Sequence, residues 1–409
     1  MTKQIQSPKT LHADVFIAGG GPVGLMLAIG LSRQGKRVVL AERFLPKNGE
    51  KENVKTAFDG RVLALSKGSQ QVLQELGIWS ELVQYTTSIE HVHVSQKGYL
   101  GITTLHAEDV DVDALGYSVQ SSDLGAVLWK IANESACITL LCPAVLTDFV
   151  EKDSSVEISV ECHSGTDSQY AQKLVAQVVV GADGTQSKVR EILGLAIDEK
   201  SYDAFGVLAQ IETEQHPQGW AYERFTNDGP VALLPMEGHL HKAVLVCPSE
   251  QLEYVKSLSD QEYIKLFADK MGERLGRFTQ VSPRVVYPLR ETYVPQMTKG
   301  RAILMGNASH TQHPVAAQGL NLGIRDIEVF LQVAIECKDL GDQAWLNEYA
   351  QRRTQDHEKV MGLTDGLIQV FQHSSPLVGH LRGIGLMAMQ AMPGLKRRFS
   401  KFAMRGKRA

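Results

Sequence analysis

The chain has 409 residues, of which 43% are hydrophobic and 22% charged, and its formal charge is −4. A chain of this length and composition folds into more than one domain, and its slight acidity argues against a nucleic-acid-binding protein. Met1 to Ala13 lack the apolar core of a signal peptide, and no segment approaches the roughly 20 apolar residues of a membrane span. The five cysteines contain no C-x-x-C pair, so we expect reduced thiols in a cytoplasmic protein.

The first elements predict a nucleotide-binding unit. Residues 14–18 form an apolar strand, residues 23–34 a helix, and residues 37–41 a second strand. The turn after the first strand reads Gly19-x-Gly21-x-x-Gly24. In a dinucleotide-binding fold the first glycine makes a tight turn, the second admits a pyrophosphate, and the third lets helix and strand pack.

An acidic residue follows the second strand of this unit, as the same fold requires. Glu42 is placed to accept hydrogen bonds from the ribose hydroxyls of an adenosine. Arg43 beside it keeps open the alternative of a 2′-phosphate and hence NADP.

Polar residues 43–60 predict a loop that ends before Arg61. Helices are expected over 66–76 and 122–133, and strands over 91–95, 100–105, 156–162 and 174–180. The last strand leads into a second glycine turn, Gly181-Ala182-Asp183-Gly184. Its aspartate is of the kind that accepts main-chain N–H bonds in a tight turn.

The pattern changes between residues 202 and 287. Segments with apolar residues at every second position alternate with turns, and a helix is expected over 260–275. This pattern is typical of an antiparallel sheet, which we interpret as a substrate module.

The α/β character returns after residue 301. An apolar strand over 302–305 leads into a glycine-rich loop, residues 306–323, and helices are expected over 320–336, 342–358 and 363–373. Small residues let main-chain N–H groups approach a ligand, and a helix N-terminus adds a positive dipole end. His310 and His313 have the spacing of a metal pair, but no carboxylate pattern supports them, so we predict no metal site.

Three glycine turns in this order resemble the aromatic-hydroxylase family of FAD-dependent monooxygenases. Four segments narrow the resemblance to the FAD-dependent hydroxylases of ubiquinone biosynthesis: FDGRVLAL (58–65), HVS (93–95), RFTNDGPVALLPM (224–236) and HPVAAQGLNLG (313–323). The similarity extends from Asp14 to about Met392.

The resemblance implies an α/β fold with a glutathione-reductase-like, Rossmann-type FAD domain and an inserted antiparallel β-sheet substrate domain. It divides the chain into a first part of the FAD domain (1–90), a second part with a β-ribbon (91–201), the substrate sheet (202–287), a third part of the FAD domain (288–375), and a C-terminal helix with a basic tail (376–409).

It also implies how FAD is held. Asn307 stands where the family usually has an aspartate that accepts a bond from the ribityl chain, and Ala317 replaces a frequent glycine. His313 and Pro314 match a rigid turn beside the flavin ring, and the N–H groups of Gln318 and Gly319 face its pyrimidine end. The full predicted cofactor set is Gly19, Gly21, Gly24, Glu42, Arg43, Arg61, Gln120, Asp183, Gly184, Gly306, Asn307, Gln318, Gly319, Leu320 and Asn321.

The implied activity is hydroxylation of a polyprenylated phenol of the 2-polyprenyl-6-methoxyphenol type, through a flavin C4a-hydroperoxide formed with O2. NAD(P)H is the expected electron donor, and no side chain need act as a nucleophile. The group that ionises the phenol is not identified. Alternatives are a hydroxylase for another aromatic substrate or ring position, a flavin dehydrogenase or halogenase, and a non-catalytic scaffold of a biosynthetic assembly.

The C-terminus carries the most uneven charge of the chain. Asp365 is the last acidic residue, and seven Lys or Arg residues lie between Lys396 and Arg408. We expect this segment to contact a membrane surface or other ubiquinone-biosynthesis proteins; a solvated tail is the alternative.

Overall fold

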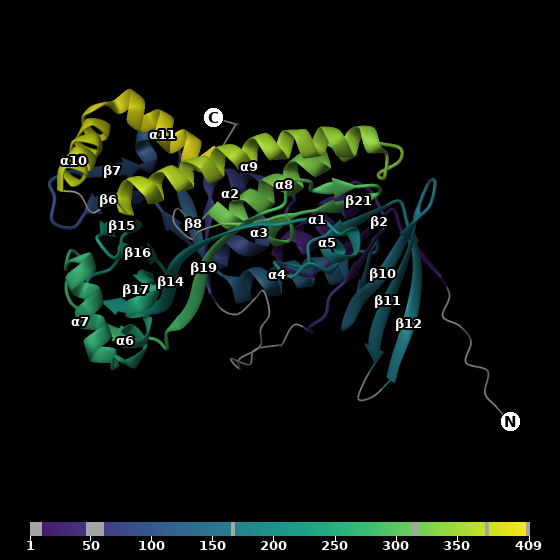
Figure 1. The fold of residues 1–409 in the computed structure, drawn as a ribbon, viewed down its shortest axis with the longest axis horizontal. Helices are drawn as coiled ribbons and strands as arrows, with labels where there is room; N and C mark the ends of the chain where they lie inside the picture. Colours follow the sequence, from purple (N-terminus) through teal and green to yellow (C-terminus); the bar gives the residue numbers. More distant parts are fainter. Residues whose placement is uncertain (1–9, 46–60, 165–167, 313–317, 373–375, 406–409) are drawn as a thin grey trace.

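The computed structural model describes residues 10–45, 61–164, 168–312, 318–372 and 376–405 (Figure 1). At its centre lies a six-stranded sheet in the order β20-β21-β13-β2-β3-β9. Its five parallel strands are β2 (Val15–Ala18), β3 (Val38–Ala41), β9 (Ile138–Leu141), β13 (Val178–Gly181) and β21 (Ala302–Leu304), with β20 (Thr298–Lys299) antiparallel at one edge.

Both faces of the six-stranded sheet are covered. Helices α1 (Pro22–Arg33), α4 (Ser121–Glu134) and α8 (Gln318–Ala334) pack on one face, where Ile17 lies in their shared core. The other face packs on α5 (Lys188–Leu193) and a second sheet, into which Phe16 points. That sheet contains β1 (Leu11–His12), β12 (Ser168–Ala176), β11 (Val156–Ser164) and β10 (Ala144–Glu151). Burial on both sides explains why these strands are continuously apolar.

A nine-stranded sheet forms the second large body of the molecule. Its order is β22-β19-β14-β17-β16-β15-β6-β7, with β18 beside β14. The bounds are β6 (His91–Gln96), β7 (Ile102–His106), β14 (Asp198–Thr213), β15 (Trp220–Thr226), β16 (Gly229–Pro235), β17 (Leu240–Pro248), β18 (Phe278–Val281), β19 (Val285–Tyr293) and β22 (His310–Thr311). Helices α6 (Leu252–Ser257) and α7 (Asp260–Met271) cover one face through Tyr263 and Phe267.

This sheet recruits strands from outside residues 202–287. The sequence places residues 91–106 with the FAD domain, whereas β6 pairs in parallel with β15, from His91 opposite Trp220 to Gln96 opposite Phe225. Parallel pairing across more than a hundred residues leaves no local sequence signal, which is why periodicity misses it. The division into domains otherwise stays a prediction.

A small sheet joins the two bodies. It consists of β4 (Val62–Ser66), β8 (Gly116–Gln120) and β5 (Thr86–Ile89). Helices α2 (Lys67–Glu75) and α3 (Trp79–Leu82) lie between β4 and β5 in the chain. Lys242 of β17 donates through Nζ to the carbonyl of Val62 at 2.6 Å, and Ser118 of β8 donates to the carbonyl of Pro235.

The C-terminal helices differ from the prediction in two ways. Helix α9 (Gln343–Gln372) continues through Gly362 and Gly366, whereas two helices were expected there. The end of the chain forms two packed helices, α10 (Pro376–Ala391) and α11 (Pro393–Arg405), beside β6, β7 and α2 (Figure 1). Lys396 of α11 is buried and bonds Asp109 at 2.6 Å.

Candidate cofactor site

Four turns converge at one edge of the six-stranded sheet. The parallel strands β21, β13, β2 and β3 are neighbours in that order, and each leads at its carboxyl end into a predicted motif. These motifs begin at Gly306, Gly181, Gly19 and Glu42. Ligands of open α/β sheets bind at this edge, so the strand order alone assembles the predicted site.

The first two turns touch each other. Gly19 has a φ of +106°, and a Cβ there would lie 2.4 Å from the carbonyl oxygen of Ala182. A Cβ at Gly24 would lie 2.0 Å from the carbonyl oxygen of Gly19. Only glycine fits at either position. Gly21 precedes Pro22, the first residue of α1, so the helix N-terminus opens onto the same edge.

The third motif docks on the same helix. Val23 packs between Gly306 and Gly323, since Cβ atoms added to these glycines would lie 2.9 and 2.8 Å from its Cγ2. Gly306 also has a φ of +54°. The loop and α8 are thereby fixed against the start of α1.

The carboxylate of Glu42 organises the end of β3. It accepts hydrogen bonds from the N–H groups of Gly20 at 2.6 Å and Phe44 at 2.9 Å, one on each oxygen. Each oxygen keeps a further lone pair, so the group can still accept from a ribose hydroxyl. Arg43 is exposed, 5.9 Å from the ring of Phe44.

The two carboxylate oxygens of Asp183 differ in their hydrogen bonds. Its Oδ2 accepts from the N–H groups of Lys188 at 2.7 Å and Val189 at 3.3 Å, at the start of α5. Within the described residues its Oδ1 is buried without a hydrogen-bond partner. Gly184, with a φ of +83°, has open space where a side chain would lie. A buried acceptor beside open space suits a bound polar group.

Arg61 and Gln120 are adjacent although far apart in sequence. Gln120 lies opposite Val62 in the β4–β8 pair, and the N–H of Ser121 donates to the carbonyl of Arg61 at 2.7 Å. The guanidinium of Arg61 lies 5.0 Å from the ring centroid of Tyr287, on β19. Arg61 therefore spans the junction between the FAD-binding part and the nine-stranded sheet.

The predicted residues of the third motif take different positions. Asn307 is exposed in a short 3-10 turn, and Gly319 in the first turn of α8 has open space around it. Gln318 begins α8, and Leu320 is half-buried. His313, Pro314 and Ala317 lie outside the described residues.

Asn321 uses its side chain within the protein. Its Oδ1 accepts from the N–H of Ser66 at 2.8 Å and the hydroxyl of Ser69 at 2.7 Å, and its Nδ2 donates to the carbonyl of Ala64 at 3.0 Å. The side chain thus ties α8 to β4 and α2.

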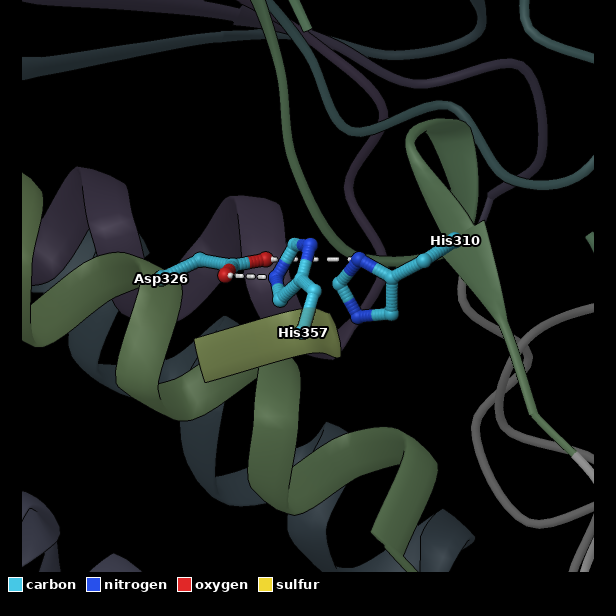
Figure 2. A group of neighbouring side chains, drawn as sticks. All are labelled: His310, Asp326 and His357. Atoms are coloured by element: carbon cyan, nitrogen blue, oxygen red, sulfur yellow. Dashed lines mark hydrogen bonds and ion pairs between the residues drawn. The ribbon is translucent and has the colours of Figure 1, made fainter. Parts of the chain in front are cut away.

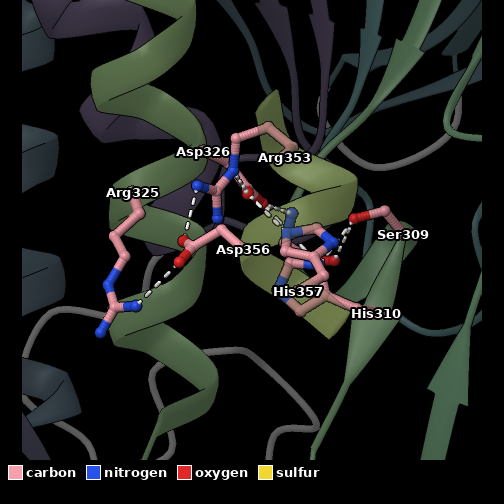
Figure 3. Close-up of polar contacts among 8 residues, drawn as sticks. Ser309, His310, Arg325, Asp326, Arg353, Asp356 and His357 are labelled. Atoms are coloured by element: carbon pink, nitrogen blue, oxygen red, sulfur yellow. Dashed lines mark hydrogen bonds and ion pairs between the residues drawn. The ribbon is translucent and has the colours of Figure 1, made fainter. Parts of the chain in front are cut away.

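A buried polar network that the sequence did not predict lies behind the third turn (Figures 2 and 3). Asp326 of α8 accepts through Oδ1 from Arg353 Nε at 2.7 Å and shares that oxygen with His357 Nε2 at 2.9 Å. Arg353 also donates to Asp356, which pairs with Arg325. The sequence did carry one indication that Asp326 is buried. Asp326 stands four residues from both Leu322 and Phe330, on the buried stripe of α8.

The charges in this network balance. Burial opposes ionisation of Asp326, but Arg353 and the neighbouring histidines hold its pKa well below the ordinary range. Burial and the adjacent His357 lower the pKa of His310 to about 3, so His310 is neutral at physiological pH. The ligand atoms of His310, Asp326 and His357 lie within 4.8 Å of one another, as in a metal site. Because a guanidinium already neutralises the carboxylate, the donor set fits a charged hydrogen-bond network better than a cation site.

A Rossmann-type sheet with glycine turns at one edge, joined to a large and mostly antiparallel sheet, defines the class of FAD-dependent aromatic monooxygenases. Comparisons with known proteins agree. The FAD binding domain model matches residues 12–364. The p-nitrophenol 4-monooxygenase PnpA of Pseudomonas putida has the same fold, with a TM-score of 0.77 at 17% identity over 98% of this chain and 100% of that one.

Full-length relatives define the family more narrowly. The chain is 31% identical over 399 residues to the ubiquinone hydroxylase UbiL of Rhodospirillum rubrum, covering 96% of this chain and 89% of that protein. It is 26% identical over 396 residues to the 3-demethoxyubiquinol 3-hydroxylase of Escherichia coli, covering 96% and 98%. The chain belongs to the FAD-dependent hydroxylases of ubiquinone biosynthesis, and it is an FAD-dependent monooxygenase.

Proposed function

We propose that this monooxygenase hydroxylates the aromatic ring of a polyprenylated phenol, of the 2-polyprenyl-6-methoxyphenol type, with O2 and NAD(P)H as cosubstrates. The observation that carries the proposal is the 31% identity to a ubiquinone hydroxylase across 96% of the chain. The cofactor edge and the antiparallel sheet support it, because together they provide a flavin site and a wall for a substrate.

The cofactor roles follow the geometry of the four turns. Gly19, Gly21 and Gly24 would hold the pyrophosphate at the start of α1, and Glu42 the ribose. Asn307 would accept from the ribityl chain, and the N–H groups at the start of α8 would face the flavin's pyrimidine end. FAD, when bound and reduced, supplies the activated oxygen atom; the chain binds, orients and excludes water.

The substrate would lie against the face of the nine-stranded sheet opposite α7. Ala243 and Leu245 of β17 point into the core under α7, so Val244 between them points to the opposite face. Its cross-strand neighbours are Leu208 and Ala232. This apolar row suits an aromatic ring with a hydrocarbon tail. A hollow of about 430 Å³ near His216, Tyr222 and Arg274 lies on the α7 side, so we do not assign it to the substrate.

Metabolite analysis of a strain lacking this chain tests the substrate and the ring position. We expect one polyprenylated phenol to accumulate and to disappear on complementation with the wild-type chain. Normal ubiquinone and no accumulated precursor would refute the assignment. Rates of anaerobic flavin reduction by NADH and by NADPH in the purified protein test the donor.

We also propose that α10 and α11 place the enzyme on an anionic bilayer, where a polyprenylated phenol resides. Helix α10 exposes four large apolar side chains at spacings of three and four residues: Leu377 (70% exposed), Leu381 (57%), Ile384 (55%) and Met387 (45%). The opposite side packs on the β6–β7 hairpin, where Gly383 contacts Gly101. Exposed Arg397, Arg398 and Lys401 follow on α11. An apolar stripe beside basic residues is typical of helices that lie in a membrane interface. Among the described helices, none is long and apolar enough to cross a membrane.

Vesicle co-sedimentation tests this surface. Leu381→Ser combined with Ile384→Ser should lower binding to phosphatidylserine-containing vesicles several-fold without changing FAD content. Ile335→Ser, 65% exposed just after α8, is the matched control. Unchanged vesicle binding of the double variant would refute the proposal that α10 and α11 bind a bilayer. If the variant lost only its binding to other biosynthetic enzymes, the apolar stripe would be a contact surface for a protein partner.

A further inference from the structure

Strand β15 carries one carboxylate, Glu223. Its neighbours on the strand point toward α7: Arg224 donates through Nη1 to the carbonyl of Met271 at 2.7 Å, and Tyr222 packs in the core under that helix. Because side chains alternate along a strand, Glu223 between them points to the opposite face.

That face looks onto the FAD-binding part at β17 and is covered by α10 and α11 beside β6 and β7, where Gln390 of α10 bonds Thr103. Glu223 lies opposite Ala232 on β16 and Val94 on β6, in the row that continues to Val244. Lys242 points to the same face two residues before Val244, and its Nζ reaches the carbonyl of Val62 in β4. Glu223 therefore stands within the apolar wall that we assign to the substrate.

The carboxylate of Glu223 is partly buried, and in the described part of the chain it has no hydrogen-bond or ion-pair partner. Among the described residues, Lys242 on this face donates to the carbonyl of Val62, and Arg61 lies against the ring of Tyr287, several strands away. Burial raises the pKa of Glu223 to about 8. An unpaired carboxylate in an apolar wall is costly for stability, and such groups gather at sites of proton transfer.

We propose that Glu223 is the general base that ionises the phenol, an inference that rests on the proposed function. The phenol O–H bond breaks, the proton passes to a carboxylate oxygen of Glu223, and the electron pair stays on the phenolate oxygen. The added charge raises electron density at the ortho and para ring carbons, which then accept oxygen more readily. Because burial raises the pKa of Glu223 to about 8, only the ionised fraction of this carboxyl acts as the base near neutral pH, and the wild-type rate should rise as the pH approaches that value.

Glu223→Gln tests the role, since it keeps the shape of the side chain and removes the base. We expect FAD content and substrate affinity close to wild type and a kcat lower by about 10²–10⁴-fold. The rate of the variant should rise with pH toward the phenol's own ionisation, and a ring-halogenated, more acidic phenol should restore a large part of it. Glu223→Asp should retain intermediate activity, and Glu237→Gln, an exposed carboxylate in the turn after β16, should behave as wild type.

A merely structural role would lower FAD content or stability and leave the preference for acidic phenols unchanged. Wild-type kcat and pH profile in Glu223→Gln would overturn the inference while leaving the hydroxylase function intact. If the wild-type protein hydroxylates no phenol, the proposed function itself fails.

Discussion

The main-chain N–H of Gly306 donates to Oδ2 of Asp326 at 3.1 Å. The first residue of the third glycine turn is thus held by a carboxylate whose other oxygen binds Arg353 of α9 (Figure 3). Since Asp326 is fully buried, turn, helix α8 and helix α9 are fixed as one unit behind the cofactor edge.

Asp326→Asn should therefore destabilise the protein and weaken FAD retention together. It removes one of the two carboxylates that lie 2.7 Å from the buried guanidinium of Arg353, and breaking a buried ion pair costs about 3–5 kcal/mol. Urea unfolding and the FAD absorbance per protein check both effects. Glu348→Gln, which breaks an exposed pair with Arg352 on the same helix, should change stability by less than about 1 kcal/mol. Equal losses in the two variants would show that the network has no special role.

Buried histidines make stability depend on pH. Burial lowers the pKa of His93 and His241 to about 4 and that of His310 to about 3. Below about pH 6.5 the unfolded chain takes up protons at these residues, while the folded chain does not until about pH 4. Folding stability should therefore fall as the pH falls through this window. Glu223 acts in the opposite direction, because its raised pKa lets the folded state hold a proton that the unfolded state has lost.

Urea unfolding at several pH values between about 4.5 and 7 measures how the free energy of unfolding changes with pH. This range lies between the histidine pKa values of the folded and the unfolded chain. His241→Gln should lower the number of protons taken up on unfolding by about one. His216→Gln, at an exposed histidine, is the control. An unchanged slope in His241→Gln would mean that this histidine is not kept neutral by burial.

Gly21→Glu should abolish FAD binding, since a charged side chain would occupy the space of the pyrophosphate at the start of α1. Gly98→Asn is a suitable control because Gly98, with a φ of +81°, has open space around it and asparagine tolerates that conformation. Full FAD occupancy in Gly21→Glu would remove the dinucleotide assignment.

Asn307→Asp should be tolerated, whereas Asn307→Leu should weaken FAD retention. Among the described residues the exposed amide of Asn307 has no hydrogen-bond partner, so the leucine variant would lose only the expected ribityl contact. One lost polar contact costs about 1–3 kcal/mol. FAD titration of the apoprotein measures the difference. Equal FAD affinity of the leucine variant and the wild type would exclude Asn307 as a ribityl contact.

Local patterns predicted the strands, turns and helices at this edge of the six-stranded sheet well, whereas the cofactor contacts there stay predictions. The strand before Gly19, the helix after it and the turn at Gly181 form as expected, because glycine spacing and apolar runs act within a few residues. The pairing of β6 with β15 and the partners of Asp326 were missed, since both join segments far apart in the chain. The sequence did not single out Glu223, because its apolar neighbours come from strands β6 and β16, whose pairing with β15 is known only from the structure.

Isotope incorporation in a single turnover tests the central claim most directly. The purified, chemically reduced flavoprotein is mixed with ¹⁸O2 and a short-chain 2-prenyl-6-methoxyphenol, so that the identity of the electron donor does not affect the result. We expect a hydroxylated product carrying one ¹⁸O atom on the ring, formed in proportion to bound FAD. Reoxidation of the flavin without any ¹⁸O-labelled phenol product would contradict the assignment of this chain as a hydroxylase of polyprenylated phenols.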